Sequence, residues 1–315
     1  MATVGTGFGV RHGLAALGAD ATRLVSLLDG VFTQWALDAG AERCTLPALL
    51  PVVDAAALGV YENFPHLAMV AATLRVDDGA PELRRPERIA PAQLQDVQLA
   101  MPSATCYGVY LDLRDQEIPD GMLITVVNTC YRNESHFDGL RRLRAFRMRE
   151  IVALGSPEHV RRHNELFTGL VRDFAARIGL KLELENATDP FFDPDGVQAR
   201  WQQMVPVKKE FVHGGQLAIA SVNNHRTFFG DRCGIHLEGG AKVSTGCAAF
   251  GLERWVAALS ETYDGDWQAI LRAVENARPV ENARPVERLD PSRTAGPSRT
   301  LDPRPAEFQP PSRPG

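Results

Sequence analysis

The segment YRNESHFDGLRRLRAFRMRE, residues 131–150, and the strand-like residues beside it decide the fold. Before it, Met122–Val127 are apolar and rich in β-branched residues, which predicts a buried strand. After a polar, arginine-rich stretch the chain returns through Phe146–Glu150. The pattern therefore predicts two neighbouring strands joined by a long loop, with Arg132-Asn-Glu134 at the end of the first and Glu150 on the second.

Two helices are predicted on either side of this strand pair. Residues 21–40 carry apolar side chains at the i, i+3, i+4 spacing of an amphipathic helix, with Gly40 as a stop. A second helix opens at Ser156-Pro157-Glu158, where serine suits the cap, proline the first turn and the acid the positive end. It ends at Gly179. Its expected buried stripe is Leu166, Leu170, Phe174 and Ile178.

Further short segments complete the expected fold. Four are β-like in composition or alternation, and one closing segment is helical. Strands separated by long excursions favour an α+β fold, with a mostly antiparallel sheet flanked by helices. The expected strands are 111–113, 181–185, 216–222 and 241–249, and the closing helix is 251–259.

Composition limits the class of protein. The 315 residues are 44% hydrophobic and carry a net charge of −5, which is typical of a globular protein and gives no sign of a basic nucleic-acid-binding surface. No apolar run reaches the roughly 18 residues that a membrane span needs, and no secretory signal is apparent. The five cysteines are odd in number and widely spaced, unlike a disulfide framework. A cytoplasmic protein with free thiols is expected.

The C-terminal residues have a different character. VENARP at 274–279 is repeated at 280–285, and PSRT occurs at 291–294 and 297–300. Large apolar residues almost disappear, so this tail cannot bury enough surface to offset its ordering entropy. We therefore predict a catalytic domain over residues 1–275 and a disordered, Pro/Arg-rich tail over 276–315.

A third motif carries chemistry together with the two strands. It is Gly246-Cys247-Ala-Ala-Phe250-Gly251-Leu-Glu253-Arg254, a strand that leads into a helix. Taken singly, such arginine–carboxylate pairs are usually surface ion pairs of little energetic value, and glycines at a strand end usually mark a turn. In combination, Arg-x-Glu, a loop, Phe-x-x-x-Glu and a later Gly-Leu-Glu-Arg resemble motifs 2 and 3 of the class II aminoacyl-tRNA synthetases. The helix at 21–40 and the following segment with Pro47 resemble motif 1, the dimer-forming element, so a homodimer is expected.

This resemblance implies roles for the motif residues. Arg132 would contact the α-phosphate of ATP, where negative charge develops during attack by the carboxylate. Glu134 would contact the adenine side, Phe146 would stack on the adenine ring, and Arg254 would hold the far phosphates. Arg132 and Arg254 are thus the predicted catalytic residues. Ser221 and Asn223 are predicted to line the ATP or amino-acid site.

Cys106, Glu150 and Cys247 are competent zinc ligands, and three protein ligands leave a fourth position open, as in catalytic sites. Their spacing alone does not distinguish them from inert buried residues. The chain resembles, over about residues 20–260, the atypical archaeal-type seryl-tRNA synthetases and still more their truncated homologues, the amino acid:carrier protein ligases. The resemblance is carried by FRMREIV (146–152), DPFF (189–192), NNHRTFFG (223–230) and CAAFGLER (247–254). It implies that a zinc ion held by these three residues binds the amino group of the substrate, in its unprotonated form.

The resemblance also implies a reaction. ATP and a small amino acid (glycine, alanine or serine) would give an aminoacyl-adenylate, and the aminoacyl group would pass to the phosphopantetheine thiol of a carrier protein. Magnesium would accompany ATP, although Leu217–Ala220 lacks the magnesium-binding glutamate of typical seryl enzymes. About 20 residues precede the motif 1 helix, so a tRNA-binding module and tRNA as acceptor are not expected. Two alternatives stay open: a tRNA-aminoacylating enzyme, and a regulatory homologue that binds an amino acid without catalysis.

The remaining cysteines match no ligand position of the family. Cys44, Cys130 and Cys233 are expected to be structural thiols. His225, beside Asn223, is expected either to support the ligands or to be structural.

Overall fold

The computed structural model describes residues 5, 7–76, 87–189, 192–193 and 207–278. Nearly all of the predicted disordered tail, 276–315, lies outside these residues, so the division into domains stays a prediction. Among the described helices, none is both long enough and apolar enough to cross a membrane.

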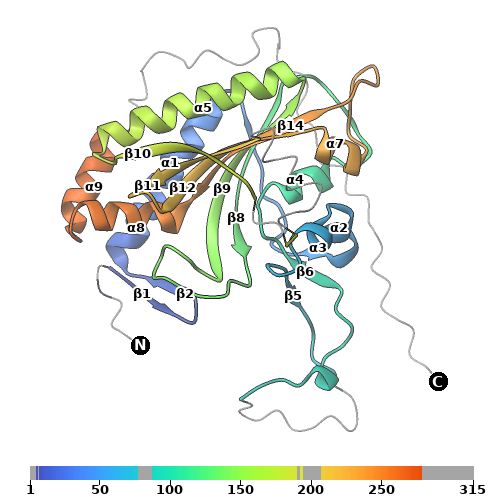
Figure 1. Ribbon diagram of the computed structural model, residues 1–315, viewed down its shortest axis with the longest axis horizontal. Coiled ribbons are helices and arrows are strands. Elements are labelled where there is room, and N and C mark those ends of the chain that lie inside the picture. The colour runs from blue at the N-terminus through green and yellow to red at the C-terminus, as the bar shows by residue number, and fades with distance from the viewer. Residues whose placement is uncertain (1–4, 6, 77–86, 190–191, 194–206, 279–315) are drawn as a thin grey trace.

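A seven-stranded sheet forms the centre of the molecule (Figure 1). Neighbouring strands are antiparallel except for the edge pair β3 and β8. The strand pair predicted from the central segment is confirmed as β8 and β9, at the interior of the sheet. In spatial order the strands are β10 (Leu182–Ala187), β11 (Lys208–His213), β12 (Leu217–Arg226), β14 (Ser244–Gly251), β9 (Ala145–Gly155), β8 (Met122–Tyr131) and β3 (Glu42–Arg43).

Four helices cover one face of this sheet (Figure 1). The predicted first helix is α1 (Ala19–Asp38), and Phe32 on it stacks on Phe250 of β14 with ring centroids 4.2 Å apart. The predicted closing helix is α8 (Leu252–Thr262), but α9 (Trp267–Asn276) follows it and was not predicted. The fourth helix is α5 (Pro157–Arg177), whose cap Ser156 accepts a hydrogen bond from the backbone N–H of His159.

The predicted stripe of α5 is partly wrong. Leu166 and Leu170 are half-buried, and the fully buried row runs beside them through His163, Phe167 and Val171. The row includes a histidine, which an apolar pattern does not reveal. Glycine at 246 allows α5 to approach β14, because a Cβ there would lie 2.6 Å from a methyl group of Val160.

The other face of the sheet carries smaller elements and a second core. The predicted strand at 111–113 is wrong, since these residues belong to or follow the helix α4 (Tyr107–Asp112). Cys106, Val109, Tyr110 and Leu113 are all buried at i, i+3, i+4 and i+7, the spacing of a helix rather than a strand. Beside α4 lie α2 (Val52–Ala57), α3 (Val60–Asn63), α7 (Phe228–Cys233), the short strands β4 (Leu50–Pro51), β5 (Met69–Ala71) and β6 (Leu99–Met101), and the pair β7 (Glu117–Ile118) and β13 (His236–Leu237).

Two further elements are not part of the central sheet. The hairpin β1 (Phe8–Arg11) and β2 (Leu14–Leu17) precedes α1. The 3-10 turn η1 (Pro91–Gln93) lies beyond β5 and β6, in the arm that extends from the body (Figure 1).

A buried ion pair joins α1 to β9. Successive side chains of a strand point to opposite faces, so Arg149 faces α1 while Glu150 faces the second core. Arg149 is fully buried and donates two hydrogen bonds of 2.8 Å to the carboxylate of Asp29, and it also donates to Thr125. The pair therefore fixes the helix against the strand that carries Glu150.

We expect Asp29→Ala to lower the free energy of unfolding by about 3–5 kcal/mol, because it leaves a buried guanidinium without its counter-charge. The control is Glu275→Ala, which breaks the solvent-exposed pair of Arg23 and Glu275 and should change the same quantity by less than about 1 kcal/mol. Urea unfolding of both variants measures the difference. Equal, small effects would contradict a structural role for the buried pair.

His163 should make stability depend on pH. Its ring is fully buried, Nε2 lies 3.1 Å from the carbonyl oxygen of Ile151, and burial lowers its pKa to about 4. The unfolded chain takes up a proton near the ordinary pKa of about 6.5, so the free energy of unfolding should fall by about 3 kcal/mol as pH falls from about 6.5 to about 4. Urea unfolding at several pH values measures this. His163→Gln should flatten that part of the curve, and an unchanged slope would contradict the assignment.

Candidate metal and nucleotide site

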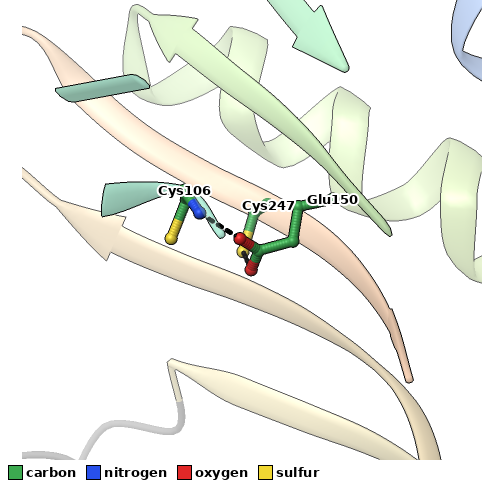
Figure 2. Close-up of side chains that lie close together, drawn as sticks. All are labelled: Cys106, Glu150 and Cys247. Carbon is green, nitrogen blue, oxygen red and sulfur yellow. Dashed lines mark hydrogen bonds between the residues drawn. The ribbon is translucent and has the colours of Figure 1, made fainter. Parts of the chain in front are cut away.

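Three elements bring the predicted zinc ligands together (Figure 2). Cys106 immediately precedes α4, Glu150 lies on β9 and Cys247 lies on β14. Their exposed fractions are 3%, 2% and 1%, and their ligand atoms all lie within 4.8 Å of one another. Two sulfurs of a tetrahedral zinc site are about 3.8 Å apart, given zinc–sulfur bonds of about 2.3 Å, so the spacing is close to what that metal needs.

Sheet register explains why Glu150 and Cys247 meet. Glu150 is opposite Ala249 on β14, and Cys247 is two residues along the same strand, so both side chains point to the same face. Cys247 Sγ lies 3.4 Å from Glu150 Oε1. The backbone N–H of Cys106 donates to Glu150 Oε2 and fixes the other carboxylate oxygen.

The electrostatics of the three residues suit a dication. The pKa of Cys106 is raised well above its usual value, first by its hydrogen bond to Cys247 and then by burial. Burial is also the largest cause that raises the pKa of Glu150. Three buried acids cannot all ionise side by side without a compensating positive charge. A zinc ion would supply that charge, and two thiolates with a carboxylate are a donor set that zinc accepts.

Cys106, Glu150 and Cys247 line a cavity of about 530 Å³, a size typical of small-molecule sites. Among the predicted site residues, Arg132, Ser221 and Asn223 also line this cavity. Glu134, Phe146 and Arg254 are not among its lining residues. The structure thus brings six of the nine predicted residues around one cavity and places the other three in the adjoining motif 2 and motif 3 elements.

Arg132 is held in place at the edge of this cavity. Its Nε and Nη2 donate to the carbonyl oxygen of Ser103 at 3.3 and 3.2 Å, and its guanidinium lies 5.0 Å from the ring centroid of Phe146. Glu134 accepts a hydrogen bond of 2.7 Å from Arg142. Hydrogen bonds of Arg132 and Glu134 therefore hold the motif 2 loop in place.

Arg254 is a second buried cation. It donates to the carbonyl oxygens of Arg141 and Ala218, both at 3.0 Å. Burial first, and then the charge of Arg132, lower its pKa to about 10, so it stays protonated at neutral pH. Within the described residues, neither Arg132 nor Arg254 forms an ion pair with a carboxylate. Two such guanidiniums favour a polyphosphate ligand.

The cavity also contains a lysine that was not among the predicted site residues. Lys208 on β11 lines the cavity and forms ion pairs with Asp189 at 3.1 Å and Glu210 at 2.9 Å. The strand was missed because Lys-Lys-Glu reads as a polar loop. Its register opposite Asn223 brings Lys208 to the site face, and no sequence pattern indicates that pairing.

The remaining cysteines lie away from the ligand group. Cys44, Cys130 and Cys233 are all free thiols. Cys130 is fully buried, with Thr105 Oγ1 3.4 Å from its sulfur, and burial raises its pKa to about 12. The structural role predicted for these three thiols stays a prediction.

Comparison with known proteins identifies the fold and the family. Residues 99–263 match the tRNA synthetase class II core domain (G, H, P, S and T). The amino acid–[acyl-carrier-protein] ligase 2 of Bradyrhizobium diazoefficiens is 30% identical over 244 residues, which span 69% of each chain. The chain belongs to the amino acid–[acyl-carrier-protein] ligase family. It is accordingly an AMP-forming ligase built on a class II synthetase core, and enzymes with this core use magnesium with ATP.

Further relatives agree with this assignment. Ligase 1 of the same bacterium is 28% identical over 270 residues, 77% of this chain and 78% of that protein. A type-2 serine–tRNA ligase of Methanococcus maripaludis is 30% identical over 150 residues, 42% of this chain and 29% of the relative. The structure of M. kandleri SerRS in complex with A. aeolicus tRNASec superposes with a TM-score of 0.70 at 20% identity, over 85% of this chain and 57% of that one. The predicted α+β class II fold is confirmed.

Proposed function

We propose that this ligase activates a small amino acid (glycine, alanine or serine) with ATP and transfers it to the phosphopantetheine thiol of a carrier protein. The observation that carries the proposal is the convergence of Cys106, Glu150 and Cys247 beside Arg132 in one cavity. The names of the two Bradyrhizobium relatives support a carrier protein as acceptor. The enzyme is proposed to act as a homodimer.

Zinc is proposed to be held by Cys106, Glu150 and Cys247. When bound, it would act as a Lewis acid that holds the α-amino group of the substrate in its neutral form. The cavity around these ligands is lined by the polar side chains of Ser221 and Asn223, which are proposed to line the amino-acid or ATP site. The substrate carboxylate would then face Arg132, whose side chain lines the same cavity.

The arginines are proposed to bind the phosphates. Arg132 would stabilise the charge that develops on the α-phosphate as the carboxylate attacks, while Arg254 would hold the far phosphates. Phe146, under the Arg132 guanidinium, would stack on the adenine ring, and Glu134 would contact the adenine side. These residues position ATP and stabilise charge, which is what transfer of a nucleotidyl group requires. Magnesium would accompany the phosphates.

One assay tests the reaction and a second tests the acceptor. ATP–pyrophosphate exchange with each amino acid, in protein of known zinc content, should show exchange with one or more of glycine, alanine and serine. Exchange with no amino acid would favour a non-catalytic, amino-acid-binding protein.

Incubation of the active enzyme with labelled amino acid, tRNA and phosphopantetheinylated carrier protein should label the carrier protein. Labelling of tRNA alone would overturn the proposed acceptor.

A further inference from the structure

Two side chains of β12 contact the sulfur of Cys247. Asn223, directly opposite Cys247 in the sheet register, donates from Nδ2 at 3.3 Å. His225 Nε2 lies 3.9 Å from the same sulfur. Within the described residues, no side-chain N–H donates a hydrogen bond to the sulfur of Cys106, so the two thiols have different surroundings.

The orientation of the Asn223 amide is determined by its neighbours. Its Nδ2 also donates to Ser221 Oγ at 3.1 Å, so its two N–H groups serve the hydroxyl and the sulfur. Its backbone carbonyl accepts from Asn164 of α5 at 3.2 Å. A flipped amide would turn its carbonyl oxygen toward a metal-bound thiolate, which can only accept a hydrogen bond.

The ring of His225 is fixed from its other side. Tyr110 Oη lies 3.2 Å and Thr245 Oγ1 3.4 Å from Nδ1. Phe229 packs edge-on against the imidazole, with centroids 5.0 Å apart, and stacks on Tyr110. If Cys247 is a metal-bound thiolate, Nε2 must carry the proton, and Nδ1 then accepts from one of the two hydroxyls.

We propose that Asn223 and His225 are positioning residues, which donate two hydrogen bonds to the Cys247 thiolate when zinc is bound. This inference rests on the proposed zinc site. Groups that hydrogen-bond to a metal ligand without contacting the metal orient that ligand and adjust how much charge it gives to the metal. Cys247 would therefore donate less charge to zinc than Cys106, and the metal would attract the substrate amine more strongly. His225 would not itself occupy the fourth coordination position.

Zinc affinity of the full chain, measured by competition with a chromogenic chelator, tests the proposal. Asn223→Leu and His225→Phe remove an N–H donor and should each weaken zinc binding by about 10- to 100-fold. His225→Gln keeps an N–H and should recover part of the loss. The matched control is His213→Gln on β11, since His213 lies near Lys181 and Glu261 rather than at the cavity.

A spectroscopic readout separates positioning from general destabilisation. In the cobalt-substituted protein, loss of a hydrogen bond raises the energy of the thiolate electrons, so the sulfur-to-cobalt charge-transfer band should move to longer wavelength in Asn223→Leu and His225→Phe. It should be unchanged in His213→Gln. Zinc affinity and band position equal to wild type in both variants would overturn the inference.

Two other results are decisive. An imidazole in the zinc coordination shell of the wild-type protein, seen by X-ray absorption, would make His225 a ligand and overturn its positioning role. A wild-type chain that binds no zinc would overturn the proposed metal site as well. Wild-type zinc binding with unaffected variants would overturn the positioning role alone.

Discussion

Cys106→Ser is expected to abolish stoichiometric zinc binding and to lower amino-acid-dependent pyrophosphate exchange by about 100-fold or more, because a substrate without its anchor is no longer held in position for attack. A serine hydroxyl stays protonated at neutral pH and does not replace a thiolate ligand. The two remaining ligands would hold the metal poorly, and the substrate amine would lose its anchor. Metal analysis and exchange on the same sample measure both effects.

The matched control for this prediction is Cys130→Ser. Cys130 is fully buried, like Cys106, but its neighbour is Thr105 rather than another acid. This variant should keep its zinc and most of its exchange activity, whatever it costs in stability. Full zinc content in Cys106→Ser, or equal loss in both variants, would contradict the assignment of Cys106 as a ligand.

Arg132→Lys is expected to lower exchange by about 100- to 1000-fold through kcat, while zinc content stays unchanged. The planar guanidinium donates twice to the carbonyl oxygen of Ser103 and lies over Phe146, and an ammonium cannot keep this geometry while it also contacts a phosphate. Steady-state exchange at saturating and limiting ATP separates the effect on kcat from that on KM.

Arg144→Lys is the control for this variant. Arg144 lies over Phe137 with a similar distance of 5.0 Å to the ring centroid and is not among the residues that line the cavity. It should retain near wild-type exchange. If the two lysine variants lose activity equally, the loss reflects a disturbed motif 2 loop rather than a contact with the α-phosphate.

The elements with a strong periodic pattern were predictable. β8 is mostly apolar and β-branched, β9 returns after a polar loop, and α5 has a cap, a proline and a glycine stop in the expected places. The strand predicted at 111–113 was wrong because three residues cannot distinguish alternation from the helical spacing of Cys106, Tyr110 and Leu113. β11 was missed because its Lys-Lys-Glu start is typical of a polar loop, although Lys208 lines the cavity and pairs with Asp189.

The site was less predictable than the fold. Cys106 lies 44 residues from Glu150, so no local pattern joins them, and the hydrogen bond between them depends on how α4 packs against β9. The family resemblance supplied the ligand set, and the sheet register explains its geometry. The contact of Asn223 with Cys247 was not foreseen, because it depends on the pairing of β12 with β14.

The central claim is that a metal held by Cys106, Glu150 and Cys247 binds the amino group of the substrate. The most direct measurement is the visible absorption spectrum of the cobalt-substituted protein during titration with glycine, alanine or serine. We expect charge-transfer bands from two thiolates, and a saturable change in the cobalt bands on addition of the amino acid that supports exchange. The corresponding acid that lacks the amino group should leave the cobalt bands unchanged. An unchanged spectrum at amino-acid concentrations that saturate exchange would contradict the central claim.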